Sequence, residues 1–111
     1  MEDCVFCNIA NHTRDADILH ETDSLIVIRD IMPKAPVHLL VIPKKHVPSI
    51  NELGPEDAQL IGEVVLAAKA QAEESGIATT GYKLIWNVGK HGGQVIPHLH
   101  LHVLGGKQLA E

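Results

Sequence analysis

Three histidines alternate with leucines in His98-Leu99-His100-Leu101-His102, and this spacing constrains the fold more than any other feature of the chain. In a β-strand, successive side chains point to opposite faces. The three imidazoles then share one face, with neighbours about 6.6 Å apart, and the leucines share the other face with Val103. The pattern predicts a strand that packs its apolar face on a core and presents imidazoles that can attack, bind a metal or transfer protons.

Length and composition predict one globular domain over residues 1–111. The net charge of −5 argues against broad binding to a nucleic-acid backbone, which needs a basic face. A single nucleotide needs only a few local donors and stays possible. The acidic start Met1-Glu2-Asp3 does not resemble a signal peptide, and no run reaches the ~20 apolar residues of a membrane span. We therefore expect a cytoplasmic protein with no membrane partner and no nucleic-acid partner.

Hydrophobic periodicity predicts an α+β fold built on an antiparallel sheet of about five strands. One long helix is expected over 55–75, because Pro55 suits a first helical turn and Gly76 suits a helix end. A short helix is expected near the N-terminus, over 4–11. Strands are expected over 17–20, 24–29, 38–42, 82–87 and the histidine segment, which gives the order β-β-β-α-β-β.

A glycine-rich loop over 89–94 leads directly into the histidine segment. Gly92 and Gly93 are expected to leave their N–H groups unobstructed, and such turns can hold an anion. A plain hairpin loop is the alternative reading of the same residues. Beside three histidines, phosphate is the natural ligand, because an imidazole nitrogen is a competent nucleophile toward phosphorus. Neighbouring imidazoles and N–H groups can stabilise the phosphoryl oxygens.

The histidine segment, continued by Val103-Leu104, resembles the signature of the histidine triad family. Further segments resemble the Hint branch of that family in the same order along the chain. They are Phe6, the run from Arg29 to His38, the run from Leu40 to His46, and Asn87 with Gly92-Gly93-Gln94. The resemblance implies a histidine-triad-like fold in a single domain. It also implies a purine-nucleotide-binding homodimer that hydrolyses nucleoside 5′-phosphoramidates, typically adenosine ones.

The resemblance further implies a role for each matching residue. His100 would attack the α-phosphorus and form a nucleotidyl-histidine, which water then hydrolyses to AMP. His98 and His102 would flank it, and His38 would support the site. Asp30 would bind the ribose hydroxyls. The remaining pocket positions are Phe6, Ile9, Ile28 and Leu40 at the base, Asn87 and Gly93 near the phosphate and leaving group, and Val95 where several relatives have a phosphate-contacting Ser.

The two cysteines form one Cys4-x-x-Cys7 pair, a spacing that favours a metal or redox role in a reducing compartment. Some bacterial-type triad proteins combine such cysteines with the histidine of a Pro-Lys-Lys-His run and the first triad histidine. The resemblance therefore implies a structural zinc site of Cys4, Cys7, His46 and His98, with four protein ligands that close it to catalysis. Two free thiols in a short helix are the alternative. No organic cofactor is expected.

Three other functions stay open at this point. One is a dinucleoside polyphosphate hydrolase of the same family, and another is a nucleotide-binding regulatory module with incidental catalysis. A third is a zinc hydrolase that uses the triad as its ligand set. In an extended strand the outer imidazoles lie about 13 Å apart, which fits a line of groups along a phosphate better than convergence on one ion.

Overall fold

Five antiparallel strands form one sheet in the order β1-β2-β3-β5-β4 in the computed structural model, which describes residues 3–111. The strands are β1 (Ile18–Glu21), β2 (Leu25–Arg29), β3 (Val37–Pro43), β4 (Tyr82–Ile85) and β5 (Leu101–Gly105). The helices are α1 (Val5–Ala10) and α2 (Ala58–Glu74), with 3₁₀ turns η1 (Ile50–Glu52) and η2 (Pro55–Asp57). The predicted α+β fold, with its five-stranded antiparallel sheet, one long helix and short N-terminal helix, is confirmed.

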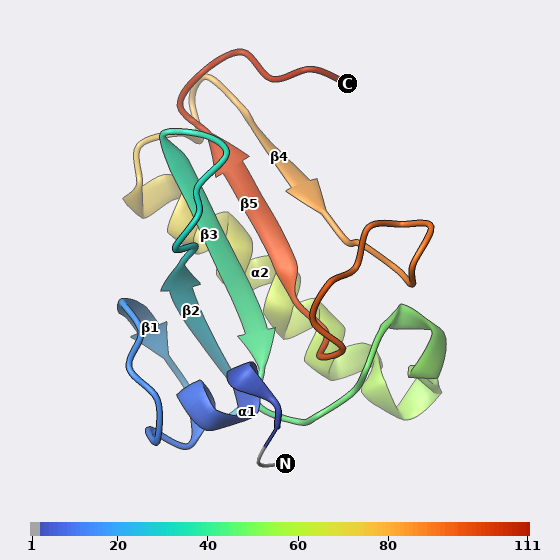
Figure 1. The fold of residues 1–111 in the computed structure, drawn as a ribbon. Helices are drawn as coiled ribbons and strands as arrows, with labels where there is room; N and C mark the ends of the chain where they lie inside the picture. The colour runs from blue at the N-terminus through green and yellow to red at the C-terminus, as the bar shows by residue number, and fades with distance from the viewer. Residues whose placement is uncertain (1–2) are drawn as a thin grey trace.

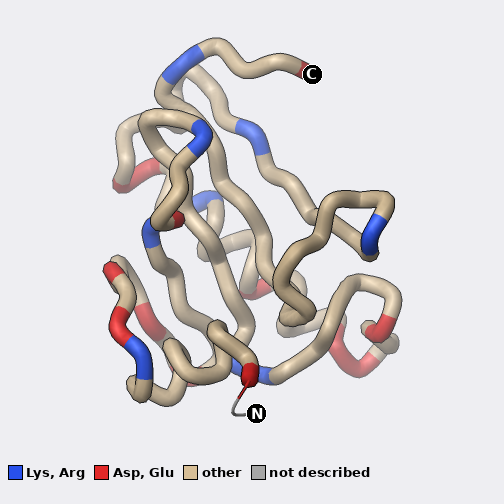
Figure 2. Tube along the Cα trace, viewed as in Figure 1, with Lys and Arg blue, Asp and Glu red and all other residues tan. Residues whose placement is uncertain are grey.

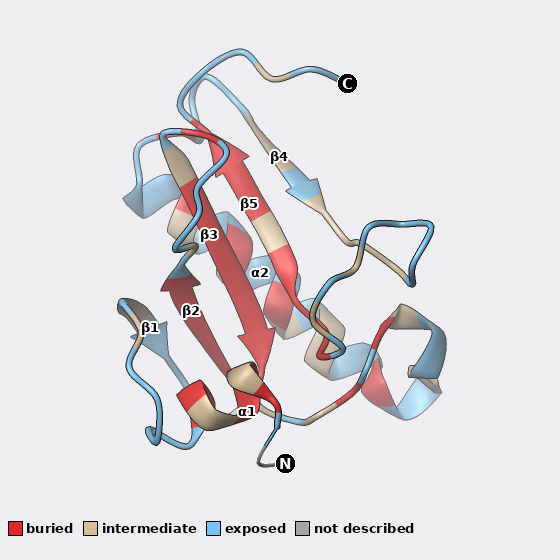
Figure 3. Ribbon diagram, viewed as in Figure 1, coloured by how far each residue is buried: buried red, intermediate tan, exposed pale blue. Residues whose placement is uncertain are grey.

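The central strands are buried on both faces because a helix covers each side of the sheet. In Figure 1, α2 lies behind β3 and β5, and α1 lies in front of one end of the sheet. Alternate residues of β2 and β3 therefore enter two separate apolar clusters. Figure 3 shows both strands coloured as buried over most of their length. Val27 and Val41 face α2, whereas Ile26 and Ile42 face α1. The site described below is on the α1 side.

The predicted helix over 55–75 consists of a 3₁₀ turn followed by an α-helix. Its first turn is η2, in which the Asp57 carboxylate accepts the N–H of Gly54 at 3.0 Å, and the α-helix starts only at Ala58. At the other end Gly76 has a φ of +76°, a conformation that costs glycine little. The N–H of Ile77 then donates to Ala72 at 3.1 Å, which completes the predicted glycine C-cap.

The histidine segment is not one strand, and this corrects the sequence prediction. Strand β5 begins at Leu101, so His98 and His100 precede it. The ladder with β3 ends at the pair Val41 and Leu101, near Pro43, which has no N–H to donate. Apolar and histidine side chains nevertheless still alternate, because His98 and His100 pack against Phe6 on the α1 side whereas Leu101 and Val103 join the apolar cluster on the α2 side.

Charged residues are distributed over the whole chain. Figure 2 shows Lys and Arg on separate segments, with Asp and Glu also spread along the trace. In residues 3–111, every helix is too short or too polar to cross a membrane.

Candidate active site and metal cluster

Helix α1 contacts two of the triad histidines. Cys4 is its N-cap, and the Cys4 sulfur accepts the N–H of Cys7 at 3.4 Å. The buried ring of Phe6 packs edge-on against His98 and His100, with ring centroids 5.8 and 5.0 Å apart. The first turn of α1 therefore forms one wall of the site.

His100 is held in one tautomer by a main-chain acceptor. Its Nδ1–H donates to the carbonyl oxygen of His98 at 2.7 Å. A neutral imidazole carries one proton, so Nε2 of His100 keeps its lone pair. A lone pair on a held imidazole is what nucleophilic attack requires.

His102 receives a hydrogen bond from His38, which lies diagonally across the β3–β5 ladder. The main-chain N–H of Lys34 donates to His38 Nδ1 at 3.0 Å, so the neutral His38 ring carries its proton on Nε2. That Nε2–H donates to His102 Nδ1 at 2.9 Å and lies 3.3 Å from a carboxylate oxygen of Asp30. His102 is thereby left with Nε2–H as a donor.

The histidines of the site are held neutral by burial. Burial is the largest cause that lowers the pKa of His38, His98 and His100. Burial, followed by the neighbouring charges of His100 and His38, lowers the pKa of His102 to about 4. Near neutral pH, the His100 ring is therefore uncharged with a lone pair on Nε2, and the uncharged His102 ring keeps its Nε2–H as a donor.

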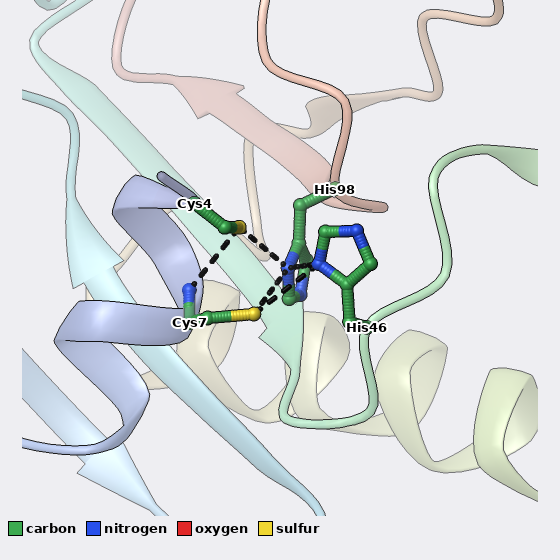
Figure 4. Close-up of side chains that lie close together, drawn as sticks. All are labelled: Cys4, Cys7, His46 and His98. Carbon is green, nitrogen blue, oxygen red and sulfur yellow. Dashed lines mark hydrogen bonds between the residues drawn. The ribbon is translucent and has the colours of Figure 1, made fainter. Parts of the chain in front are cut away.

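Four predicted metal ligands come together beside the triad, as Figure 4 shows. Their ligand atoms all lie within 4.8 Å of one another. Nδ1 of His98 lies 3.2 Å from Cys4 Sγ, 3.5 Å from Cys7 Sγ and 3.1 Å from His46 Nδ1. Cys7 Sγ lies 3.2 Å from His46 Nδ1. Both cysteines are free thiols, so these residues could together hold one metal ion.

The protonation pattern of this cluster suits a cation. The Nε2–H of His98 donates to the carbonyl of Pro43 at 2.8 Å, so Nδ1 carries the lone pair that faces the thiols. Histidines that bind metals commonly donate their other ring N–H in this way. Burial, followed by the neighbouring Cys4, raises the pKa of Cys7 to about 11, so a metal that binds there must displace a proton. Two sulfurs and two nitrogens form a donor set that zinc prefers.

The triad histidines do not converge on a single point. His98 belongs to the cysteine cluster, and His102 belongs to a second group with Asp30 and His38. Over residues 3–111, no candidate metal cluster contains His100. The geometry therefore gives no support to a zinc hydrolase that uses the triad as its ligand set.

The predicted base-pocket residues lie together in the apolar cluster that α1 forms with the sheet. Phe6, Ile9, Ile28 and Leu40 are all buried there. Asp30 is at the end of β2, half-buried, and one of its carboxylate oxygens accepts the N–H of Met32 at 2.8 Å.

The glycine-rich loop differs from its prediction. The N–H groups of Gly92 and Gly93 donate to the carbonyls of Gly89 and Lys90, at 3.2 and 3.1 Å, so they are not free to hold an anion in this structure. Asn87 closes the loop by donating to the carbonyl of Gly92 at 2.8 Å. A Cβ at Gly92 would collide with the Val88 carbonyl, because the loop is tightly turned.

Val95 directly follows the glycine-rich loop and takes no part in the loop hydrogen bonds described above. The residue is 89% exposed and belongs to neither apolar cluster.

Sequence reasoning missed four main-chain groups that hold the site. They are the N–H of Lys34 and the carbonyls of Pro43, Val47 and His98. The Val47 carbonyl accepts the N–H of Leu99 at 2.7 Å. Backbone atoms are common to all residues, so no side-chain pattern could have identified them.

Comparison with known proteins gives consistent matches over almost the full chain. The family model described as "Scavenger mRNA decapping enzyme C-term binding" matches residues 3–110. The purine nucleoside phosphoramidase of Escherichia coli strain K12 is 40% identical over 108 residues, which are 97% of this chain and 91% of the relative.

Two solved structures are also similar. A HIT family hydrolase from Legionella pneumophila Philadelphia 1 superposes with a TM-score of 0.96 at 42% identity, covering 97% of this chain and 96% of the other. A zinc-bound histidine triad family protein from Mycobacterium smegmatis has a TM-score of 0.81 at 30% identity, covering 96% of this chain and 76% of the other.

Proposed function

The chain belongs to the histidine triad family of hydrolases, and from this premise we propose that it is a purine nucleoside phosphoramidase that acts through a covalent nucleotidyl-histidine. The observation that carries the proposal is the hydrogen bond from His100 Nδ1–H to the His98 carbonyl, which leaves a lone pair on His100 Nε2. The similarity to the E. coli phosphoramidase supports the substrate class.

In the first step, His100 Nε2 attacks the α-phosphorus of an adenosine 5′-phosphoramidate. An N–P bond to the imidazole forms, the P–N bond to the amine breaks, and the amine leaves after taking up a proton from water. His102, whose neutral ring carries Nε2–H, is a donor for the phosphoryl group as its charge develops. His38 fixes that tautomer of His102.

In the second step, water attacks the same phosphorus and the bond to His100 breaks. The proton that the attacking water loses balances the one that the amine took up. AMP leaves, and Nε2 of His100 regains its lone pair while Nδ1–H still donates to the His98 carbonyl. The cycle consumes one water for each phosphoramidate, and no metal is needed for either displacement.

The nucleotide is proposed to bind between α1 and the loop that follows β2. The buried residues Phe6, Ile9, Ile28 and Leu40 are proposed to form the apolar floor against which the base packs, and Asp30 offers a carboxylate for the ribose hydroxyls. Asn87 and Gly93 are proposed to lie near the phosphate and leaving group. Val95 supplies no hydroxyl there, so any donor to the phosphate must come from other residues.

The cysteine cluster is proposed to bind one structural zinc ion through Cys4, Cys7, His46 and His98. The support is the close approach of the four ligand atoms and the zinc-bound relative. When bound, zinc would tie α1 to the segment that precedes β5. Four protein ligands leave no open position for a substrate, so the role is structural.

A homodimer is also proposed. Strand β4 is an edge of the sheet and carries Leu84, which is 39% exposed, and α2 carries Leu66, which is 66% exposed. Apolar surface of this kind favours association of two copies of the chain.

The test of the proposed activity compares three ligands under the same conditions. An adenosine phosphoramidate should be hydrolysed to AMP and amine with the highest kcat/KM. A diadenosine polyphosphate that was cleaved faster would favour the alternative hydrolase of the same family. AMP binding without turnover of either compound would favour a regulatory module and would contradict the proposal.

A further inference from the structure

His98 takes part in two sites at once, through different atoms. Its ring lies in the cysteine cluster, where Nδ1 is 3.2 Å from Cys4 Sγ and 3.1 Å from His46 Nδ1. Its main-chain carbonyl accepts the Nδ1–H of His100 at 2.7 Å. One fully buried residue therefore connects the cluster to the proposed nucleophile.

The peptide group between His98 and Leu99 is held at both ends. Its carbonyl accepts from His100, and its N–H donates to the carbonyl of Val47 at 2.7 Å. Val47 directly follows His46, whose ring packs edge-on against the His98 ring with centroids 4.9 Å apart. Residues 46–47 thus contact both the ring and the peptide of His98, so their position fixes the direction of its carbonyl.

The direction of that carbonyl decides where the proton of His100 resides. A neutral imidazole has one N–H, and burial makes an unsatisfied donor costly. While the carbonyl accepts from Nδ1–H, the Nε2 lone pair is available for attack. If the carbonyl turns away, the Nε2–H tautomer becomes populated and that lone pair is lost.

We propose that the Cys4–Cys7–His46–His98 cluster positions the nucleophile: by fixing the His98 peptide, it holds His100 in its Nδ1–H tautomer. Cys4, Cys7 and His46 act as positioning residues, and none of them contacts the substrate. A zinc ion bound to the four side chains would tighten this restraint. The expected change in kcat rests on the proposed phosphoramidase activity, whereas the expected tautomer of His100 does not.

A purely structural role makes a different prediction. If the cluster only stabilised the fold, its loss would lower the fraction of folded protein and leave each folded molecule fully active. A matched control is Val64→Ala, because Val64 is fully buried on α2, against the opposite face of the sheet. That variant should lower stability without changing the cluster.

The experiment uses His46→Ala and, as a rescue, His46→Cys, which restores a fourth zinc ligand. Imidazole ¹⁵N NMR without substrate should show a single Nδ1–H tautomer for His100 in wild type, His46→Cys and Val64→Ala. His46→Ala should show a mixture. Its kcat for an adenosine phosphoramidate, per folded molecule, should fall about tenfold or more with KM changed less than about twofold.

An unchanged His100 tautomer in His46→Ala would overturn the inference, as would an equal loss of kcat in Val64→Ala. If His46→Ala does not fold, Cys7→Ser tests the same claim, because Cys7 Sγ contacts both His46 and His98. If wild type hydrolyses no phosphoramidate, the proposed function fails, and the tautomer measurement still decides the positioning role.

Discussion

At the scale of single residues, main-chain groups decide which chemistry each histidine can perform. The Lys34 N–H sets the tautomer of His38, and the His98 carbonyl sets that of His100. The Pro43 carbonyl turns the lone pair of His98 toward the cysteines. The same kind of side chain thereby offers a lone pair on Nε2 in His100, an N–H donor in His102 and a lone pair toward the thiols in His98.

The lowered pKa of His102 predicts that acid destabilises the fold. Below its ordinary value of 6.5, the unfolded chain binds a proton that the folded chain, with a pKa of about 4, does not bind. The free energy of unfolding should therefore be highest above that range and fall, on the order of 1–2 kcal/mol for His102 alone, as the pH drops toward about 5. Urea unfolding at several pH values measures this. His102→Gln should show a shallower slope, and an identical slope in wild type and variant would contradict the prediction.

Asp30→Ala should raise KM for an adenosine phosphoramidate about tenfold and change kcat little, because a ribose contact acts equally in the ground and transition states. A 2′,3′-dideoxy nucleotide should bind both proteins alike. Asp30 also accepts the N–H of Met32 and lies near His38. Asp30→Asn, which keeps an acceptor for Met32, separates these roles. Equal losses for ribose and dideoxyribose ligands would show that Asp30 shapes the loop instead.

At the scale of elements, α1 and the segment before β5 meet at the cysteine cluster. Strand positions were predictable because aliphatic runs such as 39–42 are typical of strands, and their residues alternate between two buried faces. The break before Leu101 was not, because it depends on Pro43 ending a ladder with a strand far along the chain. Likewise, the spacing of Cys4 and Cys7 indicated a metal site, but their approach to His46 and His98 depends on tertiary packing.

Removal of one cysteine should remove the metal. Protein purified without chelators should contain about one zinc per chain, and Cys4→Ser should lose it and melt about 10 °C or more lower. Serine is a favoured N-cap, so the variant keeps the cap of α1, and the loss reports the metal rather than the helix end. Metal analysis and thermal unfolding, with and without chelator, check this. A zinc-free wild-type protein, or a chelator-independent melting temperature, would contradict it.

At the scale of the whole molecule, the sheet separates two faces that carry different side chains. Helix α2 covers one face and leaves Val65 and Leu66 exposed. Helix α1 covers the other face, where its Phe6 contacts His98 and His100. That histidines and aliphatic residues of the segment 98–103 lie on opposite faces was predictable from their alternation in the sequence. The hydrogen bonds that fix each imidazole were not, since they come from loops whose sequences carry no periodic signal.

Dimer formation can be tested independently of the active site. Light scattering at micromolar concentration should give twice the chain mass of 12.0 kDa. Leu66→Asp should shift the protein toward monomer, because a charge replaces an exposed leucine on α2, whereas Lys90→Asp in the 89–94 loop should leave the mass unchanged. A wild-type mass of one chain would contradict the dimer.

Intact-protein mass spectrometry after brief exposure to an adenosine phosphoramidate tests the central claim most directly. Wild type should gain one adenylyl group that disappears as AMP is released. Folded His100→Ala, which should still bind AMP, should gain none, and its turnover should fall by about 10³-fold or more. An adenylyl adduct on His100→Ala, or turnover above a few per cent of wild type, would contradict a covalent intermediate on His100.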